Sequence, residues 1–258
     1  MGAGVVAIVV LSYLALHRPP PPGFSAPAAA AGTARTTEST RTTQPTPTTA
    51  PATTPATTQP TEPAQPISML VIGDSYTVGG PAGNSGETGW AQLVAHDLTA
   101  AGRPVTLEVA GADGGGYVRT GSTGTTFVDL AKRAGANRDL VVFFGSRNDV
   151  AAAPDVQAAA EAAFATVRTA SPEATILVIG PSWVNGNPPG YIVTDRDAVN
   201  AAAHAAGVGF VDPLAEGWFT GDAAAFIGPD GIHPTDQGHR YLADLIRPRI
   251  ESVLPHGP

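Results

Sequence analysis

Short apolar runs recur along the chain from residue 67 onward, and several of them end in glycine. They occupy residues 69–73, 105–109, 140–145, 176–180 and 208–211. Their apolar positions are mostly continuous rather than alternating, which is typical of strands buried on both faces of a sheet. The pattern therefore predicts five strands in a covered sheet.

Helical patterns lie between these runs, at residues 88–101, 154–170, 194–206 and 236–253. Strands that alternate with helices predict a parallel sheet with helices on both sides. Ligands of such sheets bind beyond the carboxyl ends of the strands. The loops that follow the apolar runs are therefore where we expect the chemistry.

The N-terminal quarter of the chain differs in composition from the predicted α/β domain. Residues 5–16 form an apolar run of 12, shorter than the ~20 residues that span a bilayer comfortably. Its length fits the apolar part of a signal peptide, although no basic residue precedes it. Residues 19–66 contain 12 prolines, which favours a disordered linker. We predict a signal peptide or membrane anchor at 1–18, a linker at 19–66 and a globular domain at 67–258.

Composition narrows the function classes. Residues 1–66 hold three of the 14 basic and two of the 22 acidic residues, which leaves the globular part with a net charge of −9. An acidic domain repels a phosphate backbone, so we expect no nucleic-acid partner. The absence of cysteine excludes a thiol nucleophile and a cysteine-ligated zinc site. We expect no metal, no cofactor and a monomer.

A serine and an asparagine each follow a predicted strand. Ser75 stands in Gly73-Asp74-Ser75-Tyr76, where a tight turn presents the hydroxyl at the sheet edge. Asn148 follows the run at 140–145, and its side-chain amide can stabilise an oxyanion. The alternatives are a structural serine in a turn and an Asx turn or helix cap.

Two further loops carry candidate chemistry. Asp230 and His233 are three residues apart before the last helix, so the carboxylate can hold one ring nitrogen while the other takes a proton. A solvated pair or half of a metal site are the alternatives. The glycine-rich stretch 111–116 exposes backbone N–H groups, which suits an oxyanion or a flexible turn.

Taken together and in this order, these motifs resemble the SGNH (GDSL-type) hydrolase superfamily. The resemblance covers residues 67–258, with GDSY at 73–76, the glycines at 111–116, GSRND at 145–149 and DGIHP at 230–234 as its four blocks. It implies an α/β fold, a three-layer α/β/α sandwich around a five-stranded parallel, flavodoxin-like sheet.

The same resemblance implies roles for individual residues. Ser75 is the implied nucleophile and His233 the general base, with Asp230 orienting its ring. The implied oxyanion hole consists of the Ser75 N–H, a glycine N–H and the Asn148 side chain. Gly114 fits the glycine position best, with Gly111 as the alternative. Asp74 and Trp183 are expected to line the substrate pocket.

We therefore expect an exported serine esterase, secreted or tethered to the outer face of the cell membrane, that hydrolyses short-chain esters such as acetyl esters. Its expected substrate is an acyl ester, with an acylated polysaccharide or a lipid as candidates, and only the N-terminal segment is expected to touch a membrane. The alternatives are an O-acyltransferase domain acting on cell-wall carbohydrate and a non-catalytic carbohydrate-binding module. Trp90 is expected in the core, His239 at the surface, and His96 and His204 at ordinary helix positions.

Overall fold

The computed structural model describes residues 65–79 and 86–254. The predicted signal peptide or anchor at residues 1–18 and residues 19–64 of the predicted linker lie outside this part, and both stay predictions. Over the described ranges, no helix is long and apolar enough to cross a membrane.

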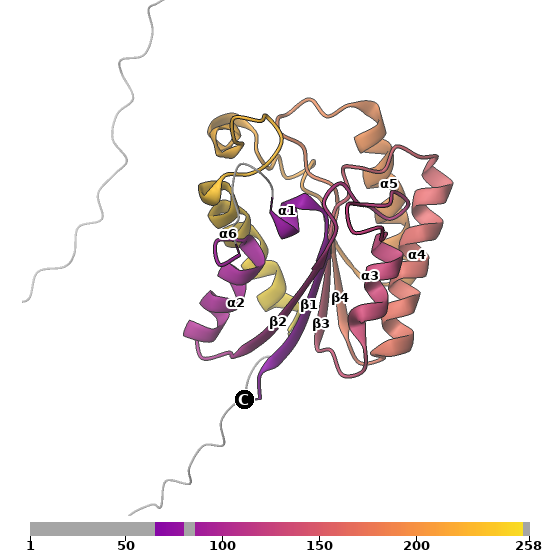
Figure 1. Cartoon of the computed structure of the whole chain (residues 1–258), viewed down its shortest axis with the longest axis vertical. Helices are drawn as coiled ribbons and strands as arrows, with labels where there is room; N and C mark the ends of the chain where they lie inside the picture. Colours follow the sequence, from indigo (N-terminus) through magenta and orange to yellow (C-terminus); the bar gives the residue numbers. More distant parts are fainter. Residues whose placement is uncertain (1–64, 80–85, 255–258) are drawn as a thin grey trace, which may run out of the picture. The chain divides into compact units, whose positions relative to one another are not determined.

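The described residues form a five-stranded parallel sheet, as the apolar runs predict (Figure 1). Successive side chains of a strand point to opposite faces, and both faces are buried in apolar clusters, which explains the continuous runs. The order β2-β1-β3-β4-β5 is the flavodoxin-like one. The strands are β1 (Ile67–Gly73), β2 (Val105–Gly111), β3 (Leu140–Phe144), β4 (Thr175–Ile179) and β5 (Gly209–Val211).

Helices cover the two faces of the sheet, so the predicted three-layer sandwich is confirmed (Figure 1). One face carries α2 (Trp90–Ala100) and α6 (Asp236–Val253). The other carries α3 (Phe127–Ala131), α4 (Ala153–Ala170) and α5 (Gly190–Ala206). The four predicted helices are all present, and α5 begins at Gly190, four residues earlier than expected, with Pro189 at its N-cap position.

The short elements were not predictable from periodicity, because three to six residues do not display a hydrophobic period. They are α1 (Ser75–Val78), α3, and two 3-10 helices at Lys132–Ala134 and Gly221–Phe226. Two of them matter for the site, since α1 begins at the candidate nucleophile and the second 3-10 helix contacts the first turn of α6.

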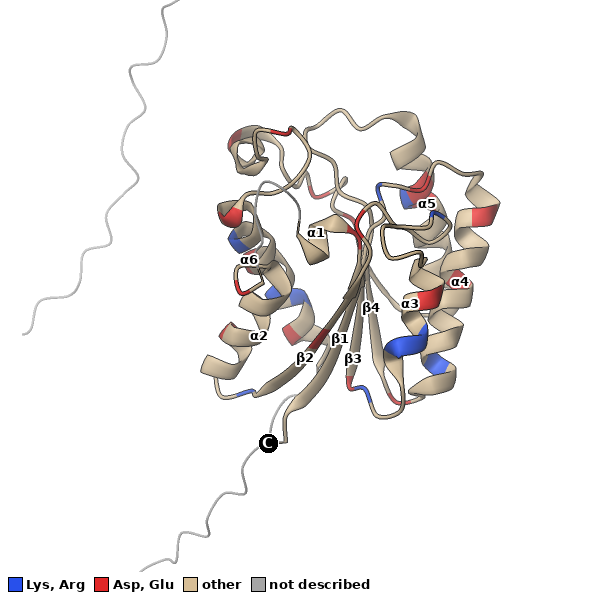
Figure 2. Cartoon of the chain, in the orientation of Figure 1, with Lys and Arg blue, Asp and Glu red and all other residues tan. Residues whose placement is uncertain are grey.

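Charged residues lie mainly on the helices and loops, with acidic and basic side chains interspersed in the view of Figure 2. Strands β1, β3 and β4 consist of uncharged residues. Glu108 of β2 is charged and forms ion pairs with Arg133 and Arg138. An edge strand can hold such a group because its flank is partly open, which is the position of β2 in the sheet.

All strands run upward in Figure 1, so their carboxyl ends meet the loops at the top of the view. The chain order reverses at β1, which lies between β2 and β3. Sheets of this kind bind ligands at such a switch point. The motif residues Ser75, Gly114, Asn148 and His233 follow β1, β2, β3 and β5, so they belong to this one edge.

Candidate active site

Ser75 occupies the first position of α1, directly beyond β1. Asp74 caps this short helix, because its Oδ1 accepts the backbone N–H of Tyr76 at 3.0 Å. Glycine is required at position 73, where a Cβ would lie 2.1 Å from Oγ1 of Thr77. The chain therefore turns sharply at the end of the strand and leaves Ser75 at the sheet edge, 4% exposed.

The loop that precedes α6 holds an aspartate–histidine pair. Oδ2 of Asp230 lies 2.7 Å from Nδ1 of His233, and its Oδ1 accepts the backbone N–H groups of Ile232 and His233 at 2.9 and 3.0 Å. Partial burial would raise the pKa of Asp230, but these hydrogen bonds outweigh it and lower the pKa to about 2. The carboxylate therefore stays ionised and fixes the ring through Nδ1, which leaves Nε2 to exchange a proton.

Tyr76 joins the nucleophile turn to this loop. Its hydroxyl donates to the Ile232 carbonyl at 2.6 Å, and its ring centroid lies 6.3 Å from that of His233. Within the described residues, no hydrogen bond joins Ser75 Oγ to His233. Catalytic hydrogen bonds are often longer before a substrate binds. The structure thus brings the two predicted residues to the same edge in an open arrangement.

Asn148 ties three loops together. Its Nδ2 donates to Oδ2 of Asp74 at 3.1 Å and to the Gly115 carbonyl at 2.9 Å. Its backbone N–H donates to Oγ of Ser146 at 2.8 Å, and that hydroxyl donates to the same Gly115 carbonyl. The amide of Asn148 is therefore held in one orientation next to the nucleophile turn.

Asp74 is buried and borders a gap too narrow for a water molecule, which Tyr76, Arg147 and Ser182 also line. Burial raises the pKa of its carboxyl to about 6, although the Tyr76 N–H and the Arg147 guanidinium lower it. A carboxyl group with this pKa is mostly ionised at pH 7. Asp74, predicted as a pocket residue, thus uses its two oxygens to hold α1 and Asn148.

Among the glycines of block two, Gly114 has the free donor. The N–H groups of Gly115 and Gly116 bond to carbonyl oxygens of their own loop. The N–H of Gly114 has no partner in the part of the chain described, and its φ of +68° suits glycine. Gly111 instead lies within β2, where a Cβ would come within 2.2 Å of Val78. The geometry favours Gly114 over Gly111 as the oxyanion donor.

Comparison with known proteins settles the family. The model of the GDSL-like Lipase/Acylhydrolase family matches residues 71–241. This chain belongs to that family. A GDSL lipase of Mycobacterium tuberculosis is 44% identical to it over 191 residues, which are 72% of this chain and 82% of that protein. The protein is therefore a GDSL-type ester hydrolase, and the resemblance to the SGNH superfamily is confirmed.

Solved structures of lower identity show the same fold. TesA superposes with a TM-score of 0.57 at 23% identity, covering 72% of this chain and 99% of that one. Est24, described as a carbohydrate acetylesterase from Sinorhizobium meliloti, has a TM-score of 0.56 at 18% identity and covers 73% and 100%. These neighbours confirm the α/β architecture of the GDSL hydrolase.

Asp149 of this GDSL hydrolase was not singled out by the sequence. It is fully buried and accepts the backbone N–H groups of Tyr117, Val118 and Arg119 at 2.8, 2.9 and 2.8 Å. A Cβ at Gly116 would lie 2.4 Å from this carboxylate, so the last glycine of block two makes room for it. Asp149 thus positions the loop after β2 against the loop that carries the proposed oxyanion donor.

Arg147 was also missed, and it accounts for the location of Trp183. The guanidinium lies 4.3 Å from the centroid of the Trp183 ring, which is in edge contact with Tyr191 at 6.4 Å. Trp183 is half-buried and borders Arg147 rather than the hollow beside Asn148. Its predicted place in the substrate pocket stays a prediction.

A surface hollow of about 340 Å³ lies beside Asn148. Besides Asn148 it is lined by Val118, Arg119, Asp149, Val150 and Ala151, from the loops after β2 and β3. Two of these side chains are apolar and yet exposed, Val118 and Val150, the latter to 74%. An apolar surface next to the proposed oxyanion donor suits one side of an ester.

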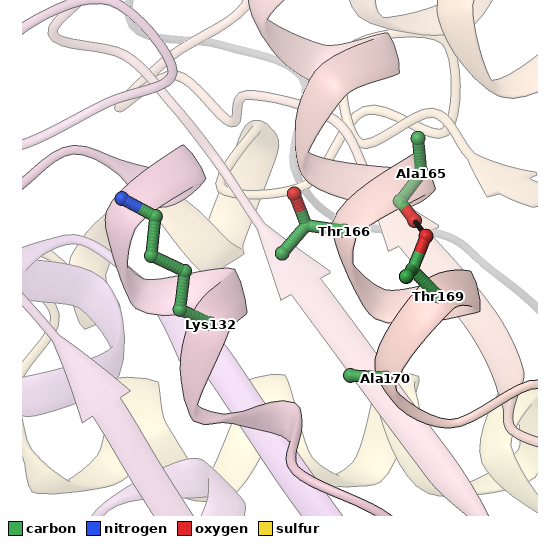
Figure 3. Close-up of a pocket in the computed structure, with 5 residues that line it drawn as sticks. All are labelled: Lys132, Ala165, Thr166, Thr169 and Ala170. Atoms are coloured by element: carbon green, nitrogen blue, oxygen red, sulfur yellow. Dashed lines mark hydrogen bonds between the residues drawn. The ribbon is translucent and has the colours of Figure 1, made fainter.

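A second hollow, of about 450 Å³, lies between the first 3-10 helix and α4 (Figure 3). It is lined by Lys132, Ala165, Thr166, Thr169 and Ala170. Lys132 is paired with Asp129, and both threonine hydroxyls donate to carbonyl groups of α4. Its lining residues include no serine, histidine or carboxylate, so this hollow does not compete with the sheet edge as the site of a serine hydrolase.

Three other histidines lie in the described part of the chain, and the prediction for one of them, His239, is wrong. His239, expected at the surface, is only 1% exposed, and burial lowers the pKa of its ring to about 4. The unpredicted 3-10 helix ends at this turn of α6, where the Phe226 carbonyl lies against Gly238. His96 and His204 are exposed helix residues, and Trp90 lies in the core, as expected. Across residues 65–79 and 86–254, no group of three histidine or acidic side chains is arranged to hold a metal.

Proposed function

We propose that this GDSL hydrolase is a serine esterase that cleaves short-chain acyl esters through an acyl-enzyme on Ser75. The observation that carries the proposal is the Asp230–His233 pair, 2.7 Å apart, on a loop that Tyr76 bonds to the nucleophile turn. A serine, a histidine and an aspartate at one sheet edge are the components of a nucleophile activated by a general base.

In the proposed reaction, Nε2 of His233 removes the Ser75 proton as Oγ attacks the ester carbonyl. The backbone N–H groups of Ser75 and Gly114 and the side-chain amide of Asn148 stabilise the oxyanion. In the structure the Asn148 amide donates to Asp74 and to the Gly115 carbonyl, so in the reaction one of these two N–H groups is shared with the oxyanion. His233 then protonates the leaving alcohol. Water, deprotonated by His233, attacks the acyl-enzyme, releases the carboxylic acid and restores the Ser75 hydroxyl. Asp230 stabilises the imidazolium throughout.

The substrate side of the proposal rests on the hollow beside Asn148. Val118, Val150 and Ala151 give it an apolar lining, and its open form and modest volume favour a short acyl group. One structural neighbour is described as a carbohydrate acetylesterase, which supports an acetylated polysaccharide as a substrate class. We further propose an envelope or extracellular location, supported by the apolar run and the Pro/Thr-rich tract before residue 67. Fractionation of host cells should find the protein in the medium or on the outer face of the cell membrane. Recovery of the protein in the cytoplasm contradicts this location.

The test is a comparison of p-nitrophenyl acetate, butyrate and octanoate hydrolysis by the full chain. Ser75→Ala and His233→Ala are expected to lower kcat by ~10⁴-fold or more, and Asp230→Ala by less, since water or a carbonyl can still orient the ring. Ser252→Ala is the matched control, because the Ser252 hydroxyl lies on α6 and donates to the Arg249 carbonyl. A folded protein without Ser75-dependent turnover contradicts the esterase, and acyl transfer to an added sugar then identifies a transferase.

A further inference from the structure

We propose that Arg147 is a positioning residue of the active site, whose guanidinium acts with the Tyr76 hydroxyl on the Ile232 carbonyl and so holds His233 at the nucleophile turn. The inference rests on the proposed function, because it assigns His233 the role of base. It concerns a residue to which the proposed reaction assigns no contact with the reacting atoms.

Three polar contacts form a closed triangle. Nη1 of Arg147 donates to the Tyr76 hydroxyl oxygen at 2.9 Å and to the Ile232 carbonyl at 3.4 Å. The Tyr76 hydroxyl donates to the same carbonyl at 2.6 Å. Burial raises the pKa of Tyr76 to about 12, so its hydroxyl keeps the proton that this bond requires. The Ile232 carbonyl thus receives two donors one residue before the catalytic base.

The loop that carries His233 needs such external contacts. Residues 229–232 are exposed, and the Asp230 bonds to Ile232 and His233 are internal to the loop. Internal bonds orient the ring within the loop but do not fix its place relative to Ser75. The donors on the Ile232 carbonyl supply that placement, because they come from α1 and from the loop after β3.

Arg147 is itself held in place, as a positioning residue must be. Its guanidinium lies 4.3 Å from the Trp183 ring centroid and 5.6 Å from that of Tyr76. Contacts of a guanidinium with aromatic faces stabilise its orientation. Arg147 also directly precedes Asn148 in the chain. One side chain therefore links the loops that carry the base, the nucleophile, the oxyanion donor and Trp183.

The test measures kcat and KM for p-nitrophenyl acetate with full-length variants. Arg147→Met removes the donors but keeps an unbranched side chain, and we expect kcat to fall 10- to 100-fold with KM within about twofold, the loss typical of a base displaced by ~1 Å. Arg147→Lys keeps a donor and should recover at least part of that loss. Arg247→Met is the matched control, because Arg247 pairs with Glu251 on the surface of α6.

A second comparison tests the shared carbonyl. Tyr76→Phe removes the other donor and should lower kcat similarly. Since both side chains act on one carbonyl, the double variant Tyr76→Phe/Arg147→Met should lose far less than the product of the single losses. Thermal unfolding of each variant separates loss of fold from loss of position. If Arg147→Met does not fold, the kcat values of Arg147→Lys and Tyr76→Phe still test the positioning role, because each variant changes one donor to the Ile232 carbonyl.

Three results overturn the role of Arg147: an unchanged kcat, a raised KM with unchanged kcat, which marks a substrate contact, or losses that multiply in the double variant. Ser75→Ala in the same assay keeps this outcome distinct from failure of the proposed function. Turnover that survives Ser75→Ala contradicts the esterase. Turnover that needs Ser75 but survives Arg147→Met contradicts the positioning role alone.

Discussion

The side-chain amide of Asn148 donates to the carboxyl of Asp74 at 3.1 Å across 74 positions of the chain. This bond joins the loop after β3 to the turn after β1. Asn148 is a proposed oxyanion donor, and Asp74 directly precedes the proposed nucleophile Ser75. Because Asp74 also caps α1, the geometry of the nucleophile turn and the orientation of Asn148 are coupled.

Asn148→Ala removes one proposed oxyanion donor. We expect kcat for p-nitrophenyl acetate to fall ~10²–10³-fold, about 3–4 kcal/mol of transition-state stabilisation, with little change in KM. Asn200→Ala, an exposed position on α5, is the matched control. A folded Asn148→Ala enzyme with normal kcat shows that the oxyanion is held elsewhere.

Asp149→Ala leaves the backbone N–H groups of residues 117–119 without their acceptor, that of Tyr117 in a buried setting and the other two in a partly buried one. An unpaired buried group costs about 1–3 kcal/mol, and the partly buried groups add less because water reaches them, so we expect roughly 2–4 kcal/mol of lost stability, measured by urea unfolding. Asp139→Ala is the control, since exposed Asp139 accepts only the Ser68 N–H at 2.7 Å. Equal losses in the two variants contradict the structural role of Asp149.

The burial of Asp195 makes the free energy of unfolding of the protein depend on pH. It is 1% exposed, and its carboxyl oxygens have no hydrogen-bond partner among the described residues. Burial, with a smaller effect of the Asp149 charge, raises its pKa to about 7 from 3.8. Between about pH 4 and 7 the folded carboxyl keeps a proton that the unfolded one has lost, so this group's contribution to stability decreases as pH rises.

Asp195→Asn removes that titration. The stability of the variant relative to the wild type should therefore increase from pH 5 to pH 8, with a slope of at most ~1.4 kcal/mol per pH unit. Urea unfolding of both proteins at several pH values measures it. A difference that is constant over this range shows that Asp195 titrates alike in the folded and unfolded chains.

Val150 tests which part of the ester occupies the hollow. If the acyl group lies there, the wild type should prefer p-nitrophenyl butyrate to acetate, because each buried methylene contributes about 0.8 kcal/mol, roughly fourfold. Val150→Asn should reduce that preference several-fold, and Val150→Leu should retain it. A butyrate-to-acetate ratio that Val150→Asn leaves intact places the acyl group outside the hollow.

The sequence was sufficient for the five strands and the four long helices, because continuous apolar runs and helical periods are local signals. The order of the strands came from the resemblance to the SGNH superfamily. The sequence also predicted three of the proposed catalytic residues from local signals. Ser75 directly follows a strand, and Asp230 and His233 are paired within one loop. Two sets of contacts could not be predicted from the sequence, because they join distant segments through backbone atoms. Arg147 contacts Ile232 over 85 positions, and Asp149 contacts residues 117–119 over about 30. The burial of His239 was not predictable, because the 3-10 helix that lies against its turn of α6 has no readable period.

The most direct test of the central claim is covalent trapping of the nucleophile. The full chain is treated with an organophosphonate fluoride, which reacts with activated serines, and the adduct is located by peptide mass spectrometry. The account predicts a single adduct on Ser75, absent from Ser75→Ala and formed at least ~10³-fold more slowly in His233→Ala. An adduct on another residue, or ester turnover that continues while Ser75 stays unlabelled, contradicts Ser75 as the nucleophile.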